Sequence, residues 1–391
     1  MRTVFSNRFS KKQTIMEHQK SERLGSLDVL RGFDLFCLVF FQPVFAALVG
    51  AVNAPWMDTI NIQFEHVIWE GFVFWDIIMP LFMFMAGASM PFAFAKYLRI
   101  GSKSQLYQRI LKRVLLLFLL GMMCQGNLLA FNPQKIYLYS NTLQAIAIGY
   151  LIASILLINF KLRGQIITTA GLLVLYWVLL TFVRMGDSGG GDFTQDHNLA
   201  EYVDRMILGR FRDGVKVTDA GLDFGKYRYT WIVSSLNFGV TVMTGVFAGQ
   251  IMKGSLSKIK KMQWLAIGGV LMIVSGMLWG LHMPIIKHIW TSSMTLFSSG
   301  ICFLLMALFY YMVDYKDYGK YLNWLKIYGM NSILAYLLYE LINFTSVSQS
   351  LFHGTQQFLG DYYPVLMRLG NVSITFLILL IMYKNKKFLK V

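Results

Sequence analysis

The sequence predicts an all-α polytopic integral membrane protein, and three observations support this fold class. Of the 391 residues, 56% are hydrophobic and 14% are charged. Long apolar runs recur from about residue 27 to residue 383, and a helix needs about 20 such residues to cross the hydrocarbon core of a bilayer. Basic residues gather in alternate connections between these runs. Because non-helical backbone in lipid would leave polar groups without hydrogen bonds, each run is expected to be a helix.

Ten runs are predicted to be transmembrane helices, which places both termini on the same side of the membrane. In chain order they cover about residues 30–50, 73–95, 111–131, 141–160, 165–184, 231–252, 264–283, 290–313, 327–345 and 365–383. The first two dozen residues are polar and basic and lack the apolar region of a cleavable signal peptide, so we expect the first span to direct insertion. The chain therefore divides into an N-terminal tail (1–25), a transmembrane domain (26–383) and a C-terminal tail (384–391).

The distribution of basic residues predicts the orientation. If the N-terminus is cytoplasmic, the cytoplasmic connections contain nearly all of the Lys and Arg residues that lie between spans, whereas the short outer loops hold only Lys135 and Lys287. Cytoplasmic loops generally carry this excess, so both termini are predicted to be cytoplasmic. The same bias, with attraction to anionic lipids, explains the formal net charge of +16. Nucleic acid is not expected as a partner.

One predicted outer loop is long, at about residues 185–229. Loops of this length are usually functional or disordered. It contains the glycines 189–191, several aspartates and arginines, and also aromatic and aliphatic residues such as Tyr202 and Phe211. The apolar residues favour an ordered lid, and the mixed charge suits a polar ligand such as a sugar.

A histidine and a carboxylate flank the start of the second span. His66 lies just before it, and Asp76 lies inside it, where a charged side chain costs about 2.5–3.5 kcal/mol on insertion scales. A neutral imidazole is the usual general base near neutral pH. If the segment is helical, Glu70 lies one turn after His66 on the same face and can orient the ring. An interfacial histidine bonded to a loop carbonyl is the structural alternative, and spacing alone does not separate the two.

Other polar residues at the spans have structural alternatives as well. Asp28 and Arg31, three residues apart, can form an ion pair at the start of the first helix. Gln144, at the start of the fourth span, can form an interhelical hydrogen bond. Lys287, Trp290 and Ser292 cluster before the eighth span, where a tryptophan is also typical of the interfacial aromatic belt, and Asn331 marks the ninth.

Motifs for metals and for soluble cofactor-binding folds are absent from the sequence. No set of His, Cys and carboxylate residues has zinc-like spacing. No phosphate-binding loop and no nucleophile elbow occurs. Neither a metal nor a prosthetic group is therefore expected.

Six motifs along the chain occur in the order found in one family, and through them the chain resembles the heparan-α-glucosaminide N-acetyltransferase-like family of transmembrane acyltransferases, including its bacterial branch. The motifs are Ser26-Leu27-Asp28…Arg31-Gly32, His66…Trp69-Glu70-Gly71…Asp76…Pro80, Leu143-Gln144, Tyr202-Val203-Asp204-Arg205…Leu208-Gly209, Lys287…Trp290-Thr291-Ser292-Ser293 and Gly329-Met330-Asn331-Ser332-Ile333-Leu334.

The resemblance implies transfer of an acetyl group from cytosolic acetyl-CoA, as co-substrate, to an extracytoplasmic amino sugar or glycan. His66 would be the active-site residue, either as a nucleophile that becomes acetylated or as a general base in a ternary complex. Glu70 and Asp76 would orient it. The residues expected to bind donor or acceptor are Asp28, Arg31, Gln42, Gln144, Lys287, Trp290, Ser292 and Asn331, and those expected to meet the CoA phosphates are Arg31, Arg109, Lys112 and Arg113.

The resemblance also bears on location and partners. The bacterial relatives, with the short basic N-terminus, indicate the cytoplasmic (inner) membrane of a bacterium. The expected partners are acyl-CoA, a sugar or glycan acceptor and membrane lipids, and a homodimer is left open.

The chain departs from the family's pattern at three positions. Gln42 replaces an asparagine of the first span, so an amide that stabilises an oxyanion would be placed differently. Ala145 replaces an arginine that often follows Leu-Gln, and Tyr229-Thr230-Trp231 stands where the family has Pro-Glu-Gly. These changes leave the acceptor open among glucosamine, another glycan amine and a polysaccharide hydroxyl.

A second hypothesis belongs to another functional class. A proton-coupled transporter or exporter of a sugar or lipid-linked precursor would use the same buried His, Asp and Glu residues as a proton relay. Transporters often contain inverted repeats, and none is evident in the sequence.

Overall fold

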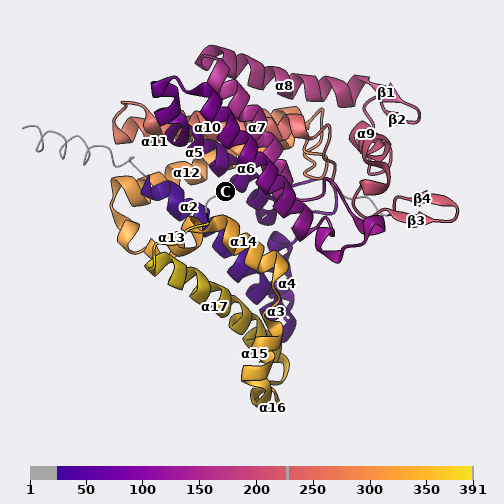
Figure 1. The fold of residues 1–391 in the computed structure, drawn as a ribbon, viewed down its shortest axis with the longest axis vertical. Helices are drawn as coiled ribbons and strands as arrows, with labels where there is room; N and C mark the ends of the chain where they lie inside the picture. Colours follow the sequence, from indigo (N-terminus) through magenta and orange to yellow (C-terminus); the bar gives the residue numbers. More distant parts are fainter. Residues whose placement is uncertain (1–23, 226–228, 390–391) are drawn as a thin grey trace, which may run out of the picture.

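Helices account for nearly all regular structure in the computed structural model, which describes residues 24–225 and 229–389 (Figure 1). Eight helical segments in this part of the chain are long and apolar enough to cross a membrane. They are Gly25–Val52, Phe74–Ile100, Thr142–Asn159, Leu162–Phe182, Ser235–Lys253, Lys258–Gly280, Ser292–Tyr315 and Thr345–Lys384. The predicted class, an all-α polytopic membrane protein, is confirmed.

The helices have the following bounds in chain order. They are α2 (Gly25–Phe36), α3 (Gln42–Val52), α4 (Pro55–Asn61), α5 (Ile78–Ile100), α6 (Lys103–Cys124), α7 (Thr142–Asn159), α8 (Leu162–Phe182), α9 (Leu199–Leu208), α10 (Ser235–Lys253), α11 (Lys258–Gly280), α12 (Ser292–Tyr310), α13 (Asn323–Met330), α14 (Ser332–Leu341), α15 (Thr345–Phe352), α16 (Gln356–Leu359) and α17 (Tyr363–Lys384). A π-helical turn, Cys37–Phe41, joins α2 to α3.

Two of the ten expected spans differ from the rest. The third, expected at 111–131, is α6, which is less apolar because its first half carries Arg109, Lys112 and Arg113. The ninth, expected at 327–345, is broken into α13 and α14 at Asn331. The amide of Asn331 binds the C-terminal backbone instead of continuing a helix: its Nδ2 donates to the carbonyl of Lys387, and its Oδ1 accepts from the N–H of Leu389.

Close helix packing in the centre of the bundle depends on small residues. Helices α5 and α10 approach so closely that a Cβ added to Gly87 would lie 1.9 Å from the carbonyl oxygen of Val242, and one added to Gly245 would lie 1.9 Å from that of Phe84. A Cβ added to Gly32 of α2 would lie equally close to the backbone of α13. Small residues allow such backbone contacts in membrane helices, and here they bring α2, α5, α10 and α13 together.

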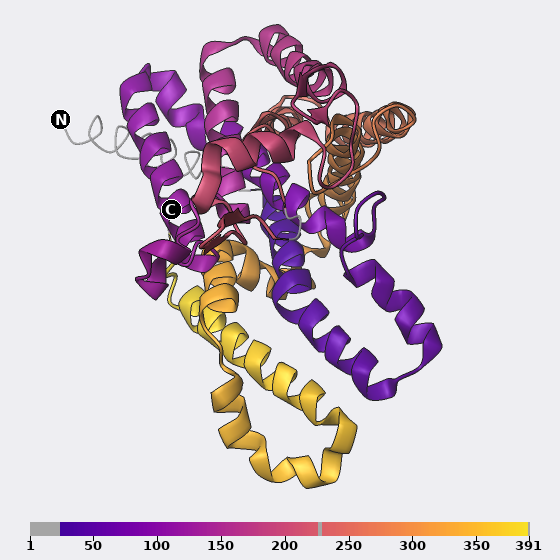
Figure 2. The same ribbon diagram turned by 90° about the vertical axis from the view of Figure 1, so that its right-hand side faces the viewer.

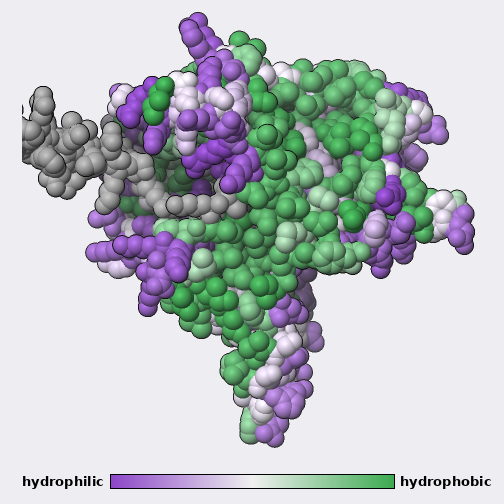
Figure 3. Space-filling view, in the orientation of Figure 1, coloured by the Kyte–Doolittle hydropathy of each residue, from purple (hydrophilic) through white to green (hydrophobic). Residues whose placement is uncertain are grey.

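Two arms project from this body in Figure 2: α3 with α4, and α15 to α17. Apolar residues cover most of the middle of the face shown in Figure 3, and hydrophilic residues gather toward its edges. A protein that exposes so large an apolar surface suits a lipid environment.

The connection between α8 and α10 contains the only strands in the described residues. It holds the hairpin β1 (Arg184–Met185) with β2 (Ser188–Gly189), then α9, then the hairpin β3 (Lys216–Thr218) with β4 (Gly221–Asp223). The loop expected at about 185–229 is therefore ordered across its described residues. The expected tails lie partly outside the description: residues 1–23 and 390–391 are not described.

Candidate active site

The segment that carries His66 is an irregular loop, residues 65–73, held against another loop. Glu70 forms an isolated antiparallel bridge with Ile286, and the N–H of Gly71 donates to the carbonyl of Ile285 at 2.9 Å. Gly71 has a φ of +119°, which a helix does not allow. The helical relation between His66 and Glu70 on which the sequence argument relied is therefore wrong. The side chain of Glu70 is exposed, and within the described residues it forms no ion pair with His66.

Three ionisable side chains from separate segments meet beside this loop, and we call them the His66–Asp76–Lys287 cluster. Nδ1 of His66 lies 2.8 Å from Oδ1 of Asp76. Nζ of Lys287, from the connection between α11 and α12, lies 3.2 Å from the same carboxylate oxygen and 3.2 Å from Nδ1 of His66. The side chains of Asp76 and Lys287 are 2% and 5% exposed, whereas that of His66 is 43% exposed.

The geometry of the cluster determines which nitrogen of His66 is available. A carboxylate can only accept hydrogen bonds, so Nδ1 is the protonated nitrogen that donates to Asp76 and Nε2 carries the free lone pair. The second carboxylate oxygen, Oδ2, accepts from the N–H of Val73 at 3.2 Å. Asp76 is thereby fixed by the turn Phe74–Ile77 at the start of α5, and it fixes the imidazole in turn.

The electrostatics of the cluster keep the imidazole neutral. Burial lowers the pKa of His66 below 6.5, and the positive charge of Lys287 lowers it further, although the hydrogen bond that His66 donates to Asp76 opposes this. Burial also lowers the pKa of Lys287 to about 8, although Asp76 partly opposes this. A neutral His66 with a free Nε2 can accept a proton or attack a carbonyl at neutral pH.

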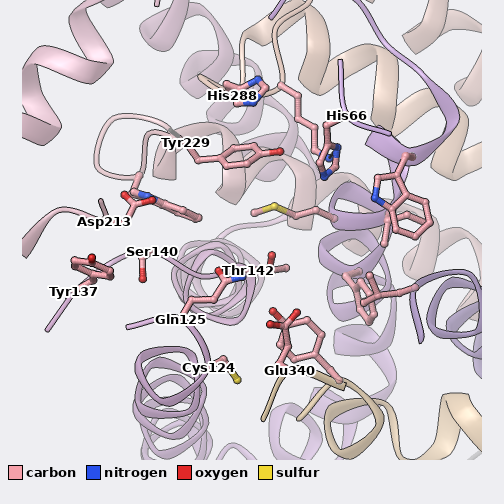
Figure 4. Close-up of a pocket in the computed structure, with 18 of the residues that line it drawn as sticks. His66, Cys124, Gln125, Tyr137, Ser140, Thr142, Asp213, Tyr229, His288 and Glu340 are labelled. Carbon is pink, nitrogen blue, oxygen red and sulfur yellow. Dashed lines mark hydrogen bonds between the residues drawn. The ribbon is translucent and has the colours of Figure 1, made fainter. Parts of the chain in front are cut away.

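The cluster borders a cavity of about 690 Å³, which we call the upper cavity (Figure 4). Its polar lining comes from loops and helices far apart in the sequence. The lining residues that carry polar groups are His66, Gln125, Asn127, Tyr137, Ser140, Thr142, Asp213, Tyr229, Trp231, Lys287, His288, Tyr336 and Glu340. Figure 4 shows Asp213, Tyr137 and Ser140 on the side of the cavity away from His66.

A second cavity of about 470 Å³, the lower cavity, lies at the other end of the bundle. It is lined by Arg31 near the start of α2 and by Arg109 and Arg113 in the first half of α6. The upper cavity meets Cys124, the last residue of α6. The lower cavity therefore follows α6 from Arg109 to Leu117, and the upper cavity meets its last residue.

Three residues line both cavities and so mark the place where they meet: Phe82, Thr142 and Tyr336. They lie on α5, α7 and α14 respectively. A continuous route between the two ends of the bundle would pass between these side chains.

Several residues expected to bind substrate instead hold the fold together. Oε1 of Gln144 accepts from the N–H groups of Ser140 and Asn141, which completes a capping box at the start of α7. The hydroxyl of Ser292 donates to the carbonyl of Leu173 at 2.8 Å. Asn331 binds the C-terminal backbone, as described above.

Trp290 and Gln42 also lie outside the upper cavity's lining. The side chain of Trp290 is buried, and its backbone has a left-handed conformation with a φ of +53°. Its indole N–H donates to the hydroxyl of Thr241 at 3.1 Å. Its carbonyl accepts from Nδ2 of Asn237 at 2.8 Å. Gln42 begins α3 and lines neither cavity. Asp28 lies 3.7 Å from Arg31, which itself lines the lower cavity.

The cavity also contains residues that the sequence analysis did not assign to a site. Asp213, Ser140 and Trp231 line it, although nothing in their spacing points to a shared site. Tyr229 stacks on His288 with ring centroids 4.6 Å apart. Burial, together with the charge of Lys287, lowers the pKa of His288 to about 4, so this second imidazole is neutral as well.

Comparisons with known proteins agree with the resemblance. The family model described as heparan-alpha-glucosaminide N-acetyltransferase, catalytic, matches residues 23–187, a region that includes His66, Asp76 and all three cavity arginines. Human heparan-alpha-glucosaminide N-acetyltransferase is 26% identical over 371 residues, which cover 82% of this chain and 53% of the human protein. The mouse protein of the same name is 24% identical over 420 residues, which cover 95% of this chain and 61% of the mouse protein.

The chain thus spans little more than half the length of these curated relatives. The region matched by the family model carries the loop with His66, the turn with Asp76 and those lining residues of both cavities that lie between positions 23 and 187. On these matches, the chain is similar to the heparan-α-glucosaminide N-acetyltransferases, over residues 23–187 for the family model and over most of its length for the two curated relatives.

Proposed function

We propose that this protein is a membrane-embedded acetyltransferase that takes an acetyl group from acetyl-CoA and transfers it to an amino sugar or glycan on the opposite side of the membrane. The observation that carries the proposal is the position of His66. Its free nitrogen belongs to a buried charged cluster beside a cavity that meets a second, arginine-lined cavity from the other end of the bundle. Similarity to heparan-alpha-glucosaminide N-acetyltransferase supports the reaction type.

The donor enters through the lower cavity. Arg31, Arg109 and Arg113 provide guanidinium groups for the phosphates of CoA, since arginine binds phosphate through paired charge-assisted hydrogen bonds. The narrow pantetheine arm passes the side chains of Phe82, Thr142 and Tyr336, and the thioester reaches His66. The excess of basic residues at this end supports a cytoplasmic position for the lower cavity.

The chemistry at His66 follows one of two balanced routes. As a general base, Nε2 takes a proton from the acceptor amine while the nitrogen of the amine attacks the thioester carbon. The C–S bond then breaks, and the proton passes from the imidazole to the CoA thiolate. As a nucleophile, Nε2 forms an acetyl-imidazole and releases CoA before the amine attacks. In both routes Asp76 stabilises the positive charge that develops on the ring.

The test of the reaction uses purified protein in detergent with acetyl-CoA and a panel of amino sugars, following CoA release and product mass. The proposal expects one CoA per acetylated sugar. A burst of one CoA per protein without acceptor would identify the nucleophilic route. Folded protein that releases no CoA with any acceptor, but moves a sugar into proteoliposomes without CoA, would instead establish a transporter.

The lower cavity makes a prediction about the donor. The double variant Arg109→Gln/Arg113→Gln is expected to raise KM for acetyl-CoA by about 100-fold or more, because each of the two lost charge-assisted hydrogen bonds contributes about 1.5–3 kcal/mol. Acetyl-N-acetylcysteamine, a thioester without phosphates, should react equally well with variant and wild type. Lys103→Gln, at an exposed position of the same helix end, is the matched control. An equal loss with both thioesters would contradict phosphate binding here.

A second prediction concerns pH. A general base is active when neutral, so the low pKa of His66 keeps wild-type kcat/KM high down to a pH below 6.5. Lys287→Met removes a positive charge that lowers this pKa, so the acid limb of the profile should move to higher pH. Lys135→Met, an exposed cation of the α6–α7 connection, should leave the profile in place. An acid limb that stays fixed or moves to lower pH in Lys287→Met would refute this role of the lysine.

A further inference from the structure

One wall of the upper cavity has polar groups that the proposed reaction at His66 does not use. This wall is made by Asp213, Ser140 and Trp231. Figure 4 shows Asp213 and Ser140 on the side of the cavity away from His66, and Trp231 packs against Tyr139, the neighbour of Ser140, with ring centroids 5.2 Å apart. We call it the Asp213 wall. Its three residues come from the α8–α10 connection, the α6–α7 connection and the segment just before α10.

Two polar atoms of this wall lack hydrogen-bond partners. Ser140 and Trp231 are 5% and 3% exposed, and Oγ of Ser140 and Nε1 of Trp231 form no hydrogen bond with any described residue. A buried polar group without a partner costs about 1–3 kcal/mol, so such groups usually indicate a missing water or ligand. A hydroxyl and an indole N–H beside one cavity are best satisfied by a ligand that can both accept and donate hydrogen bonds.

The third member of the wall is the carboxyl side chain of Asp213, which stands on a firmly held stretch of backbone. Arg212, which is fully buried, pairs with Glu201 of α9 at 2.5 Å and donates to the main-chain carbonyl of Asp213 at 3.1 Å. The N–H of Leu138 donates to the carbonyl of Phe211 at 3.0 Å, which ties this stretch to the segment that leads to Ser140. Asp213 therefore belongs to a fixed surface and not to a loose loop.

The combination has the chemistry of a sugar-binding wall. A carboxylate accepts hydrogen bonds from ring hydroxyls, a serine hydroxyl donates or accepts, and an indole N–H donates. The rings of Trp231 and Tyr229, whose centroids lie 6.1 Å apart, add apolar surface for the C–H face of a sugar. Acyl-pantetheine, which enters from the arginine-lined end, has no ring with adjacent hydroxyls to satisfy such a set.

We infer that the Asp213 wall is the acceptor subsite, and that it binds the hydroxyl edge of an aminohexose whose amino group is turned toward His66. This inference rests on the proposed function for the identity of the transferred group. It adds the residues that recognise the ring hydroxyls of the acceptor, and names Asp213 as the residue that selects a polyhydroxylated ring amine. Asp213 acts on the bound sugar and takes no part in proton transfer.

The experiment measures binding and turnover separately. Binding of glucosamine to the protein in detergent is followed by calorimetry without acetyl-CoA, and acetylation of glucosamine is compared with that of cyclohexylamine, a ring amine without hydroxyls. Asp213→Asn is expected to weaken glucosamine binding by about 10-fold or more, since hydrogen bonds to charged groups are the stronger ones. Turnover of cyclohexylamine and KM for acetyl-CoA should not change. Asp219→Asn, an exposed position of the same connection, should match wild type.

A second variant covers the case in which Asp213→Asn does not fold. Ser140→Ala removes a buried hydroxyl without a described partner, so Tm of the unliganded protein should stay the same or rise. Glucosamine binding should nevertheless weaken by about 2-fold to 10-fold, the range for a neutral hydrogen bond.

The outcomes separate this inference from the proposed function. Wild type that does not bind glucosamine, variants that bind it as tightly as wild type, or an equal loss for both amines in Asp213→Asn would overturn the acceptor subsite. Glucosamine binding that depends on Asp213, without CoA release for any amine, would uphold the subsite and overturn the acetyl transfer.

Discussion

Replacing His66 by alanine is expected to abolish acetyl transfer while the protein remains folded. His66 is the only member of its cluster with a largely accessible side chain, and its Nε2 is the free nitrogen that the chemistry requires. General base catalysis contributes about 10²-fold to 10⁴-fold, so CoA release should fall at least by that factor. Because the side chain is 43% exposed, its loss creates no buried cavity, and Tm should change little.

The measurement compares CoA release, product mass and thermal stability in detergent for wild type and His66→Ala. His353→Ala, an exposed histidine in the α15–α16 connection, serves as the control and should keep wild-type activity. Turnover at the wild-type rate in a folded His66→Ala protein would remove His66 from the mechanism.

The second large effect is expected for Asp76→Asn, which should lose both activity and stability. The amide can no longer stabilise a charged imidazole or enforce the tautomer with a free Nε2, and the loss of activity should reach about 10²-fold to 10⁴-fold. It also leaves the ammonium of Lys287, 5% exposed, without its carboxylate. Removing one partner of a buried pair costs about 3–5 kcal/mol, so Tm should fall.

A double variant separates these two effects. Asp76→Asn/Lys287→Met removes the unpaired charge as well, so Tm should recover most of the loss, while activity should stay low. Thermal unfolding and CoA release on the same preparations provide both readings. Recovery of activity together with stability would show that Asp76 serves the fold alone and does not orient His66.

Much of the fold could be predicted because the information is local. A run of about 20 apolar residues is a property of one segment, and eight of the ten expected spans correspond to helical segments of sufficient length and hydropathy. The exceptions also have local causes: four cationic residues in the first half of α6, and an asparagine that breaks the ninth span. The orientation with cytoplasmic termini stays a prediction.

The candidate site was only partly foreseeable. His66 and Asp76 stood out because ionisable groups at membrane depth are costly, yet the helical relation expected between His66 and Glu70 is wrong, since a bridge to Ile286 holds the loop open. Gln144 and Ser292 were expected at the substrate, but their hydrogen bonds go to nearby backbone. Polar residues in spans serve packing as readily as binding, and the sequence does not distinguish these uses.

The sequence by itself determined that this is a membrane protein of apolar helices, because transfer of a segment into lipid depends on that segment's own composition. Only the tertiary structure decided that Lys287 reaches Asp76 across 211 positions, and that Asp213 shares a cavity with Ser140 and Trp231. Such meetings depend on how loops at one end of the bundle are tied together. Helix packing and backbone hydrogen bonds set that arrangement jointly, and no single segment encodes it.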